Sequence, residues 1–377
     1  MKTHFEKPAD GHRANCPETK SWPLGQAIRL AVLCLALWAV GPRASAQTPP
    51  GLDLQLYAGL TITGAVGTVY SIEYVTDLAQ TNTASAWRCL EFLQLPASPY
   101  LWADKSAPAT DKRFYRAVVF AAPTNLVFIP PGTFRMGSPT NEVDRGDNEG
   151  PQTAVTISRG FWMGKYEVTQ GEYLALMGSN PSWFNGVRFT YDESCGCETN
   201  VDYGVDLSRP VEQVTWNDAT NYCSTLTQRE RAAGRITANS VYRLPTEVEW
   251  EYACRAWTST RFSYGDDPSY TSLTNYAWYD GTTHPVGQKL ANPWGLYDMH
   301  GSVWEWCHDW WSDNLPGGIA LDPQGPATGA PRVIRGGGWS EFGSVANRCR
   351  SADRFYRNPD NRFTDIGFRI LLAPGQP

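Results

Sequence analysis

Eight consecutive residues, Asp298 to Glu305, hold a dense set of groups that could bind a metal ion. Asp298 and Glu305 supply two carboxylates, and the main chain at Gly301 and Val303 can supply two carbonyl oxygens. Hard oxygen ligands of this kind are those that calcium prefers. The spacing therefore predicts a calcium site. The alternative is that Asp298 and Glu305 serve only as turn and salt-bridge residues.

Cysteine is the second residue type with chemistry to offer. Seven of the nine cysteines follow residue 46, namely Cys89, Cys195, Cys197, Cys223, Cys254, Cys307 and Cys349. An odd number leaves at least one thiol free or paired externally, and counting does not reveal the connectivity. Cys195 and Cys197 are a poor zinc half-site because no second pair of Cys or His accompanies them. We expect instead a disulfide between these two cysteines, or one disulfide from this pair to a cysteine outside the chain.

Histidine is too sparse to predict a catalytic centre. After residue 46 the chain has only His284, His300 and His308. His300 and His308 flank a Trp-Glu-Trp phrase, where a histidine is more often packed or capping than a ligand. We therefore do not expect an iron site, and no pattern indicates hydrolysis by serine, histidine and aspartate.

Residues 51–120 read as a small domain built only of strands. Alternating runs such as TVYSIEYV and WRCLEFLQL are separated by Gly, Asp and Pro, as in antiparallel sheets. The sequence predicts a small β-sandwich with a structural or adhesive role in place of a catalytic one. Residues 121–125 are the expected linker to the rest of the chain.

Short strands, long loops and a few capped helices are expected after the linker. Capping signals predict helices that begin after Thr169, Thr215 and Thr246, with Gly178 ending the first and Gly234 the second. The chain has 16 Trp, 34 Gly and 27 Pro, which favours irregular loops pinned by aromatic side chains over long helices.

The N-terminal segment indicates export. Residues 27–40 are apolar except for Arg29 and are followed by Ala44-Ser45-Ala46, which predicts a signal peptide cleaved after Ala46. An uncleaved anchor is the alternative, but the run is short for a membrane span. We expect a secreted, periplasmic or cell-envelope protein without a stable membrane span after cleavage. A formal charge of -6 favours neither nucleic acid nor anionic lipid as a partner.

Several phrases occur in the order typical of one family. They are FIPPGTFRMGS, GKYEVTQGEY, RPVEQVTWNDATNYC, YRLPTEVEWEYACR, NPWGLYDMHGSVWEW, RVIRGGGW and DIGFR. Residues 126–374 therefore resemble the sulfatase-modifying factor, or formylglycine-generating enzyme, family. The resemblance implies an α+β fold, the family's variant of the C-type lectin fold with few regular elements, preceded here by the all-β sandwich.

The resemblance also bears on the calcium site. Members of the family hold calcium at this motif through a side-chain oxygen at the position of Asp298, the carbonyls of Gly301 and Val303, and the carboxylate of Glu305. Asp298 stands where Asn is more usual, which adds charge and should not weaken the site. A second calcium site of the family does not align clearly with residues 275–280 and stays unassigned.

The catalytic cysteines of the family are missing. Active members bind copper(I) through two thiolates after an Arg-Gly-Gly-Ser turn, because this ion prefers soft ligands. Aligning Arg335 places Gly338 at the serine, Glu341 at the first cysteine and Ala346 at the second. Copper is therefore not expected. The resemblance implies a disulfide between Cys254 and Cys349, with Cys223 to Cys307 as a weaker companion.

Two functions follow from these observations. The first is a non-catalytic binding module for a peptide, protein or glycan, with a binding cleft at Trp339, Glu341 and Arg354 and long loops around Trp183, Trp278 and the 185–205 insertion. The second is a metal-dependent oxidase or protein-modifying enzyme of the same family, acting on an exported protein. The lost cysteine pair favours the binding module.

Overall fold

The computed structural model describes residues 58–83, 86–106, 112–192, 197–339 and 346–375. The first part of it is built mainly of strands, as the alternating sequence predicts, with one 3-10 helix, η1 (Leu78–Gln80), between β2 and β3. The strands pair antiparallel in two sheets, β1 with β4 and β3-β2-β5. They are β1 (Ala58–Ile62), β2 (Val69–Val75), β3 (Arg88–Gln94), β4 (Tyr100–Asp104) and β5 (Phe114–Val119).

One apolar cluster holds these two sheets together. Tyr70, Ile72 and Tyr74 point to one face of β2 because successive side chains of a strand alternate between faces. They pack with Leu90 and Trp102 from β3 and β4. The opposite face of β2 carries Ser71 and Glu73, and the latter pairs with Arg116 of β5 at 2.7 Å.

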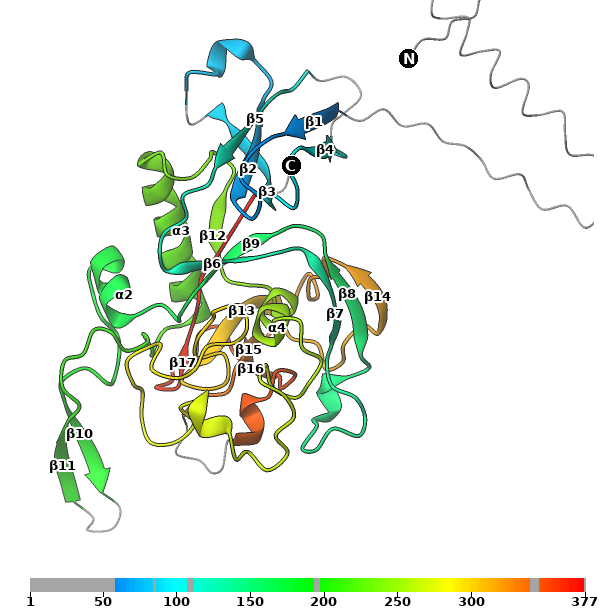
Figure 1. Cartoon of the computed structure of the whole chain (residues 1–377). Helices are drawn as coiled ribbons and strands as arrows, with labels where there is room; N and C mark the ends of the chain where they lie inside the picture. Colours follow the sequence, from blue (N-terminus) through cyan, green and yellow to red (C-terminus); the bar gives the residue numbers. More distant parts are fainter. Residues whose placement is uncertain (1–57, 84–85, 107–111, 193–196, 340–345, 376–377) are drawn as a thin grey trace, which may run out of the picture. The chain divides into compact units, whose positions relative to one another are not determined.

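The larger part of the chain contains three further sheets of three or four strands (Figure 1). The sheet orders are β12-β18-β9-β6, β14-β8-β7 and β16-β15-β13-β17. The strands are β6 (Leu126–Ile129), β7 (Gly132–Met136), β8 (Thr153–Ile157), β9 (Phe161–Gly164), β12 (Val241–Arg243), β13 (Trp304–Trp310), β14 (Gly318–Leu321), β15 (Arg332–Arg335), β16 (Phe355–Arg357), β17 (Ile366–Gly367) and β18 (Leu371–Ala373). With a few short helices this is the α+β architecture expected.

All three predicted helix starts are confirmed. Helices α2 (Gln170–Met177), α3 (Trp216–Ala232) and α4 (Glu247–Arg255) each begin with a threonine whose side chain accepts a hydrogen bond from the backbone N–H three residues on. In each case that third residue bonds back to the threonine N–H and completes a capping box. Gly178 ends α2 in the left-handed conformation, as predicted.

The N-terminal strands share core contacts with the larger part. Val69, Cys89 and Phe92 belong to the same apolar cluster as Val211, Leu244 and Phe368. Phe92 forms a β-bridge with Gly160, where a Cβ atom would lie 3.1 Å from the carbonyl oxygen of Phe92 and still closer to the Phe128 ring. Glycine is therefore needed at position 160 for the two parts to approach each other.

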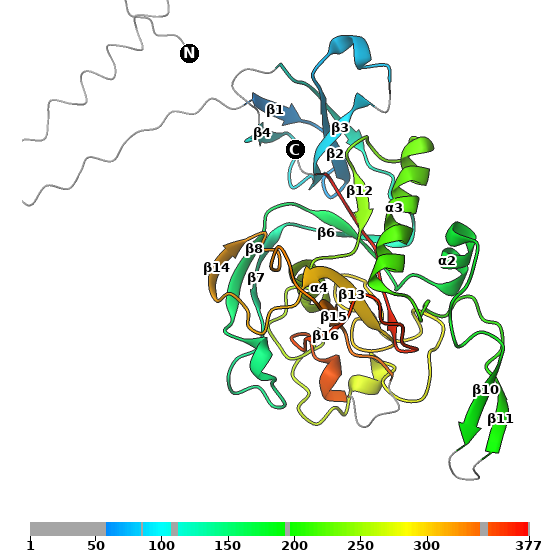
Figure 2. The ribbon, with the colours of Figure 1, turned by 180° about the vertical axis from the view of Figure 1, so that it is seen from behind.

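The 185–205 insertion forms a hairpin. Strands β10 (Val187–Asp192) and β11 (Cys197–Asp202) pair antiparallel and extend away from the sheets in both views (Figures 1 and 2). Cys195 lies outside the described residues. In the described part of the chain no helix has the length and apolarity needed to cross a bilayer, and the predicted signal peptide lies outside that part.

Helix α4 carries a buried cluster of charged side chains, which we call the α4 cluster. Its members are Glu247, Glu251, Arg255, Arg335 and Arg354. Arg354 binds Glu247 through two hydrogen bonds of 2.5 and 2.8 Å, and Glu251 accepts from both Arg255 and Arg335. Although burial raises the pKa of Glu247, the charges of Arg354 and Arg335 outweigh it and lower that pKa. Each carboxylate of the cluster is thus matched by arginine.

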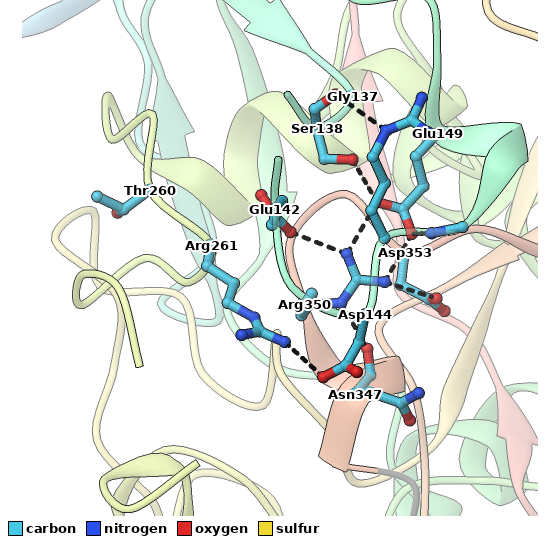
Figure 3. A network of polar contacts seen from close by, with 12 residues as sticks. Gly137, Ser138, Glu142, Asp144, Glu149, Thr260, Arg261, Asn347, Arg350 and Asp353 are labelled. Atoms are coloured by element: carbon cyan, nitrogen blue, oxygen red, sulfur yellow. Dashed lines mark hydrogen bonds and ion pairs between the residues drawn. The ribbon is translucent and has the colours of Figure 1, made fainter. Parts of the chain in front are cut away.

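A second arginine network ties the loop after β7 to the segment after position 346 (Figure 3). Arg350 binds Glu149 through hydrogen bonds of 2.8 and 2.6 Å and Glu142 at 2.8 Å. Asp144 of the same loop pairs with Arg261 at 3.0 Å. These contacts fix the segment in which the family would carry its second catalytic cysteine.

Candidate functional site

The predicted calcium segment is an irregular, fully buried loop that leads into β13. Asp298 and Ser302 adopt positive φ angles of 59° and 70°, and Gly301 has φ 142°. A Cβ atom at Gly301 would lie 2.6 Å from the carbonyl oxygen of Trp278, so only glycine fits there. Asp298, Val303 and Glu305 are 2%, 0% and 0% exposed. The structure thus places Asp298, Gly301 and Val303 in one buried loop and Glu305 at the start of the strand that follows it, β13.

Glu305 already has a cationic partner. Its two carboxylate oxygens accept hydrogen bonds of 2.6 Å from the guanidinium of Arg369, and one of them also accepts from the indole N–H of Trp250 at 2.8 Å. Arg369 is fully buried. The salt-bridge role considered for Glu305 is therefore present in the structure.

Asp298 and Glu167 have unsatisfied oxygens beside this pair. Asp298 accepts one hydrogen bond from the Gly287 N–H at 2.7 Å, but its other carboxylate oxygen is buried without a partner. Neither carboxylate oxygen of Glu167 has a partner, although the residue is only 1% exposed. Burial, and then the charge of Asp298, hold the pKa of Glu167 well above its usual range, and burial raises the pKa of Asp298 to about 6.

Glu167 is the residue that the sequence prediction missed. It lies in the GKYEVTQ phrase between the half-buried Tyr166 and the buried Val168, 131 positions before Asp298 by sequence number. The sequence did offer one indication: Glu167 is a carboxylate next to the apolar Val168, just before the capping Thr169. A carboxylate buried at such a position needs a partner. We call Glu167, Asp298, Glu305 and Arg369 the Glu167 cluster.

The charges of the Glu167 cluster do not balance. Three carboxylates face one guanidinium, and three of the carboxylate oxygens are buried and unpartnered. A divalent cation that prefers oxygen ligands fits this excess of negative charge. Among the residues that the structure describes, no group of three His, Cys, Asp or Glu side chains could hold a metal ion. An ion here would therefore also need main-chain oxygens such as those at Gly301 and Val303.

The glycine-rich turn at the family's catalytic segment is tightly packed. Gly336 and Gly337 have φ angles of 98° and 72°. A Cβ atom at Gly337 would lie 2.9 Å from the main chain of Arg348, and one at Gly338 would lie 3.1 Å from the Trp304 nitrogen. Positive φ and close approach both apply, so the turn requires glycine at its first two positions.

Ala346, at the position of the second lost cysteine, is buried in an apolar cluster. It is 6% exposed and packs with Phe262, Leu273, Ala277 and Cys349. Tyr264, Tyr270 and Tyr279 cover this cluster. Glu341, at the position of the first lost cysteine, lies outside the described residues.

The structure gives Trp339 and Arg354 different partners. Trp339 is 3% exposed, packs with Phe184 and Val303, and donates its indole N–H to the Thr364 carbonyl at 3.1 Å. Arg354 is 2% exposed and belongs to the α4 cluster. Both side chains are therefore buried. The predicted binding cleft of Trp339, Glu341 and Arg354 stays a prediction, because Glu341 lies outside the described residues.

The remaining thiols are buried. Cys89, Cys223, Cys254 and Cys307 are free thiols in the structure. Burial raises the pKa of Cys254 to about 12 and also raises the pKa of Cys349. The Cys254 to Cys349 disulfide stays a prediction. The thiols of Cys223 and Cys307 lie in different core clusters, which gives the weaker pairing no support.

His300 is a packed residue whose two ring nitrogens both have partners. One lies 2.8 Å from the Cys349 carbonyl oxygen, and the other accepts from the Ser263 N–H at 3.1 Å. Burial lowers the pKa of His300 to about 4. His308 is exposed, with its ring centroid 6.2 Å from that of Trp216. His300 thus has the packed role expected for it.

Comparison with known proteins gives a consistent result. A family profile described as "Sulfatase-modifying factor enzyme 1-like domain" matches residues 115–374. The chain is similar to the formylglycine-generating enzyme of Mus musculus, with 29% identity over 297 residues that cover 65% of this chain and 74% of the mouse protein.

Two solved structures share the fold. PvdO from Pseudomonas aeruginosa matches with a TM-score of 0.54 and 30% identity, over 66% of this chain and 94% of that one. Treponema denticola variable protein 1 matches with a TM-score of 0.52 and 28% identity, over 72% and 99% of the two chains.

Proposed function

Because the chain belongs to the sulfatase-modifying factor enzyme 1-like family, we propose that it is a non-catalytic binding protein of that family. The observation that carries the proposal is the burial of Ala346 among Phe262, Leu273 and Ala277. A position that would hold a catalytic thiol in an active member is here a methyl group in an apolar cluster.

The residues present do not fit copper. A copper(I) centre needs two thiolates, and the aligned positions are Glu341 and Ala346. The nearest thiol in the sequence, Cys349, has its pKa raised by burial, as has Cys254. A thiol that resists ionisation is a poor metal ligand. The route by which active members of the family oxidise a cysteine is therefore not proposed for this chain.

The residues present do fit calcium. Asp298 and Glu167, with the carbonyls of Gly301 and Val303, would hold the ion, while the predicted ligand Glu305 is already paired with Arg369. The support for this is the three unpartnered carboxylate oxygens and the excess negative charge of the Glu167 cluster. The ion would have a structural role, because it would join the segment before α2 to the loop before β13.

The proposed ligand is a peptide, protein or glycan, and the proposed location is outside the cytoplasm. The β10–β11 hairpin and the loops beside Trp183 and Trp278 offer contact surface on a fold that is otherwise held by buried charge and aromatic packing. Export would permit the Cys254 to Cys349 disulfide. Thiol counting under denaturing conditions, before and after reduction, would detect it.

One experiment separates binding from catalysis. The purified full chain is analysed for metals and incubated with a cysteine-bearing sulfatase peptide in the presence of added copper and oxygen. We expect no bound copper and no aldehyde in the peptide by mass spectrometry. One equivalent of copper or iron together with aldehyde formation would overturn the proposal in favour of a metal-dependent oxidase that modifies an exported protein.

A further inference from the structure

A tryptophan at the end of α4 is unusually exposed. Trp257 follows the helix by two residues, and its side chain is 68% exposed, whereas the helix itself is almost wholly buried. Burying an indole is among the largest apolar gains open to a side chain. An indole left in solvent beside a buried helix contributes little to folding, so its role is sought outside the core.

The backbone at this point is strained. Ala256 and Trp257 have φ angles of 44° and 71°, in the left-handed region where glycine is strongly favoured. Helices commonly end in this conformation, but on glycine. Two consecutive residues with side chains in the left-handed region lower stability, and such strain is concentrated at functional sites. The strain fixes the direction in which the Trp257 side chain leaves the helix.

A column of aromatic rings supports Trp257 from the core. Its ring lies 5.1 Å from that of Trp294 at an interplanar angle of 85°, so the two indoles form a right-angled corner. Trp294 packs on Tyr252 at 4.9 Å, and Tyr252 packs on Phe134 at 5.2 Å. Tyr252 is fully buried. The corner is therefore rigid at its base and open at Trp257.

The two segments that form the corner carry no charged side chain. Residues 256–260 read Ala-Trp-Thr-Ser-Thr and residues 291–296 read Ala-Asn-Pro-Trp-Gly-Leu, without any Asp, Glu, Lys, Arg or His. Hydroxyl groups follow Trp257 directly in the chain. A charged peptide or a phosphorylated ligand would find no opposite charge in these segments. A neutral ligand with an apolar face and many hydroxyls matches them.

We propose that the corner formed by Trp257 and Trp294 binds a neutral glycan by stacking a sugar ring on the exposed indole face. The weakly positive C–H bonds on one face of a pyranose ring complement the negative face of an indole. The second indole and Ser259 would contact the sugar edge, since the hydroxyls of Thr258 and Thr260 already donate to the carbonyls of Arg255 and Phe262. This names a ligand class for the binding role proposed above, at residues separate from Ala346 and from the Glu167 cluster.

The test is affinity electrophoresis of the full chain in native gels that contain single soluble neutral polysaccharides, namely a β-glucan, a xylan, a galactomannan and a dextran. We expect retardation by at least one polymer. Trp257→Ala should weaken the interaction about tenfold or more, as when an aromatic stacking surface is removed, and Trp257→Phe should retain part of it. Tyr356→Ala is the matched control, because it removes another exposed aromatic side chain, 42% exposed, on β16.

A stability measurement separates loss of binding from loss of fold. Trp257→Gly relieves the left-handed strain, so its Tm should stay within about 3 °C of the native value while binding is lost. The proposal fails if none of the four polymers retards the native chain, or if Tyr356→Ala weakens retardation as much as Trp257→Ala. It also fails if Trp257 instead mediates binding to neutral phosphatidylcholine vesicles. None of these results would affect the assay for copper and aldehyde.

Discussion

The α4 cluster and the Glu167 cluster are both buried groups of charged side chains, but they are balanced differently. In the α4 cluster Glu247 and Glu251 are matched by three arginines, and each carboxylate has guanidinium partners. In the Glu167 cluster one arginine faces three carboxylates, and only Glu305 is paired with it. A buried charge is tolerated when it is paired and hydrogen-bonded. The first cluster is thus complete within the chain, and the second is not.

The largest expected effect comes from unbalancing the complete cluster. Arg335→Met leaves Glu251 without one of its two arginines in a fully buried site. Removing one partner of a buried ion pair typically costs about 3–5 kcal/mol of unfolding free energy. Urea denaturation followed by tryptophan fluorescence measures the change.

Arg362→Met is the surface control for that variant. Arg362 pairs with Asp218 but is 48% exposed, so its loss should cost less than about 1 kcal/mol. Equal destabilisation by the two variants would mean that burial does not distinguish the α4 cluster from a surface pair.

Calcium should balance the incomplete cluster. With free calcium at about 100 times its dissociation constant, the folded chain should gain about 2.7 kcal/mol relative to chelator. Glu167→Gln should abolish most of this gain and, in chelator, should be at least as stable as the native chain, since it removes an uncompensated charge. Thermal unfolding with calcium and with chelator measures both.

Glu251→Gln is the matched control for calcium. It lies in the α4 cluster, so it should lower stability and leave the calcium effect unchanged. Glu305→Ala is a less selective test, because it also removes the partner of Arg369. If chelator leaves the unfolding of the native chain unchanged, the calcium hypothesis is wrong.

The pH dependence of stability provides a finer test at Glu212, a buried carboxylate outside both clusters. It is fully buried with one unpartnered oxygen, and burial raises its pKa to about 7. A raised acid pKa means that the folded state holds the proton more tightly, so stability falls as pH rises from about 4.5 to about 7. The stability of Glu212→Gln relative to the native chain should therefore rise by about 2 kcal/mol over that range.

Glu149 supplies the opposite sign. Although burial raises its pKa, Arg350 outweighs that effect and lowers it. Its contribution to stability is present above the pKa of the unfolded chain and is lost as pH falls through the folded value. Urea titrations of Glu149→Gln and Glu212→Gln at several pH values should give slopes of opposite sign relative to the native chain. Slopes of the same sign would contradict the distinction between paired and unpaired carboxylates.

The smallest expected effect comes from removing the side-chain cap at the start of α4. Thr246→Ala removes the side-chain oxygen that accepts from the Glu249 N–H, and loss of such a cap costs about 1 kcal/mol. Thr169→Ala, at the start of α2, should cost a similar amount. A cost at Thr246 close to that of Arg335→Met would show that the cap, and not ion pairing, limits the stability of the α4 cluster.

Local sequence patterns predicted most of the regular structure. The capping threonines Thr169, Thr215 and Thr246 each begin a helix because the signal and the contact lie within three residues. The alternating runs of the N-terminal part became strands for a similar reason: the side-chain period of two is visible in any short stretch. The order of family phrases correctly indicated the fold of the remainder.

Short sequence patterns could not predict which charged residues pair over long distances in the chain. Nothing near Glu167 in the sequence reveals that Asp298, Glu305 and Arg369 are its neighbours, since these come from two other segments. Arg354 was expected to line a cleft, and its place beside Glu247 depends on how α4 packs against the segment after position 346. The left-handed backbone at Trp257 was equally hidden, because a tryptophan gives no local sign of such a conformation.

The position of β18 has a consequence for the order of folding. This strand, β18 (Leu371–Ala373), is the last strand in the described chain, yet it lies between β12 and β9 inside its sheet, and Arg369 comes two residues before it. A nascent chain that ended before Arg369 would have a split sheet and three buried carboxylates with no counter-charge. Such a chain cannot close its core, so the domain must stay open until Arg369 and β18 have been synthesised.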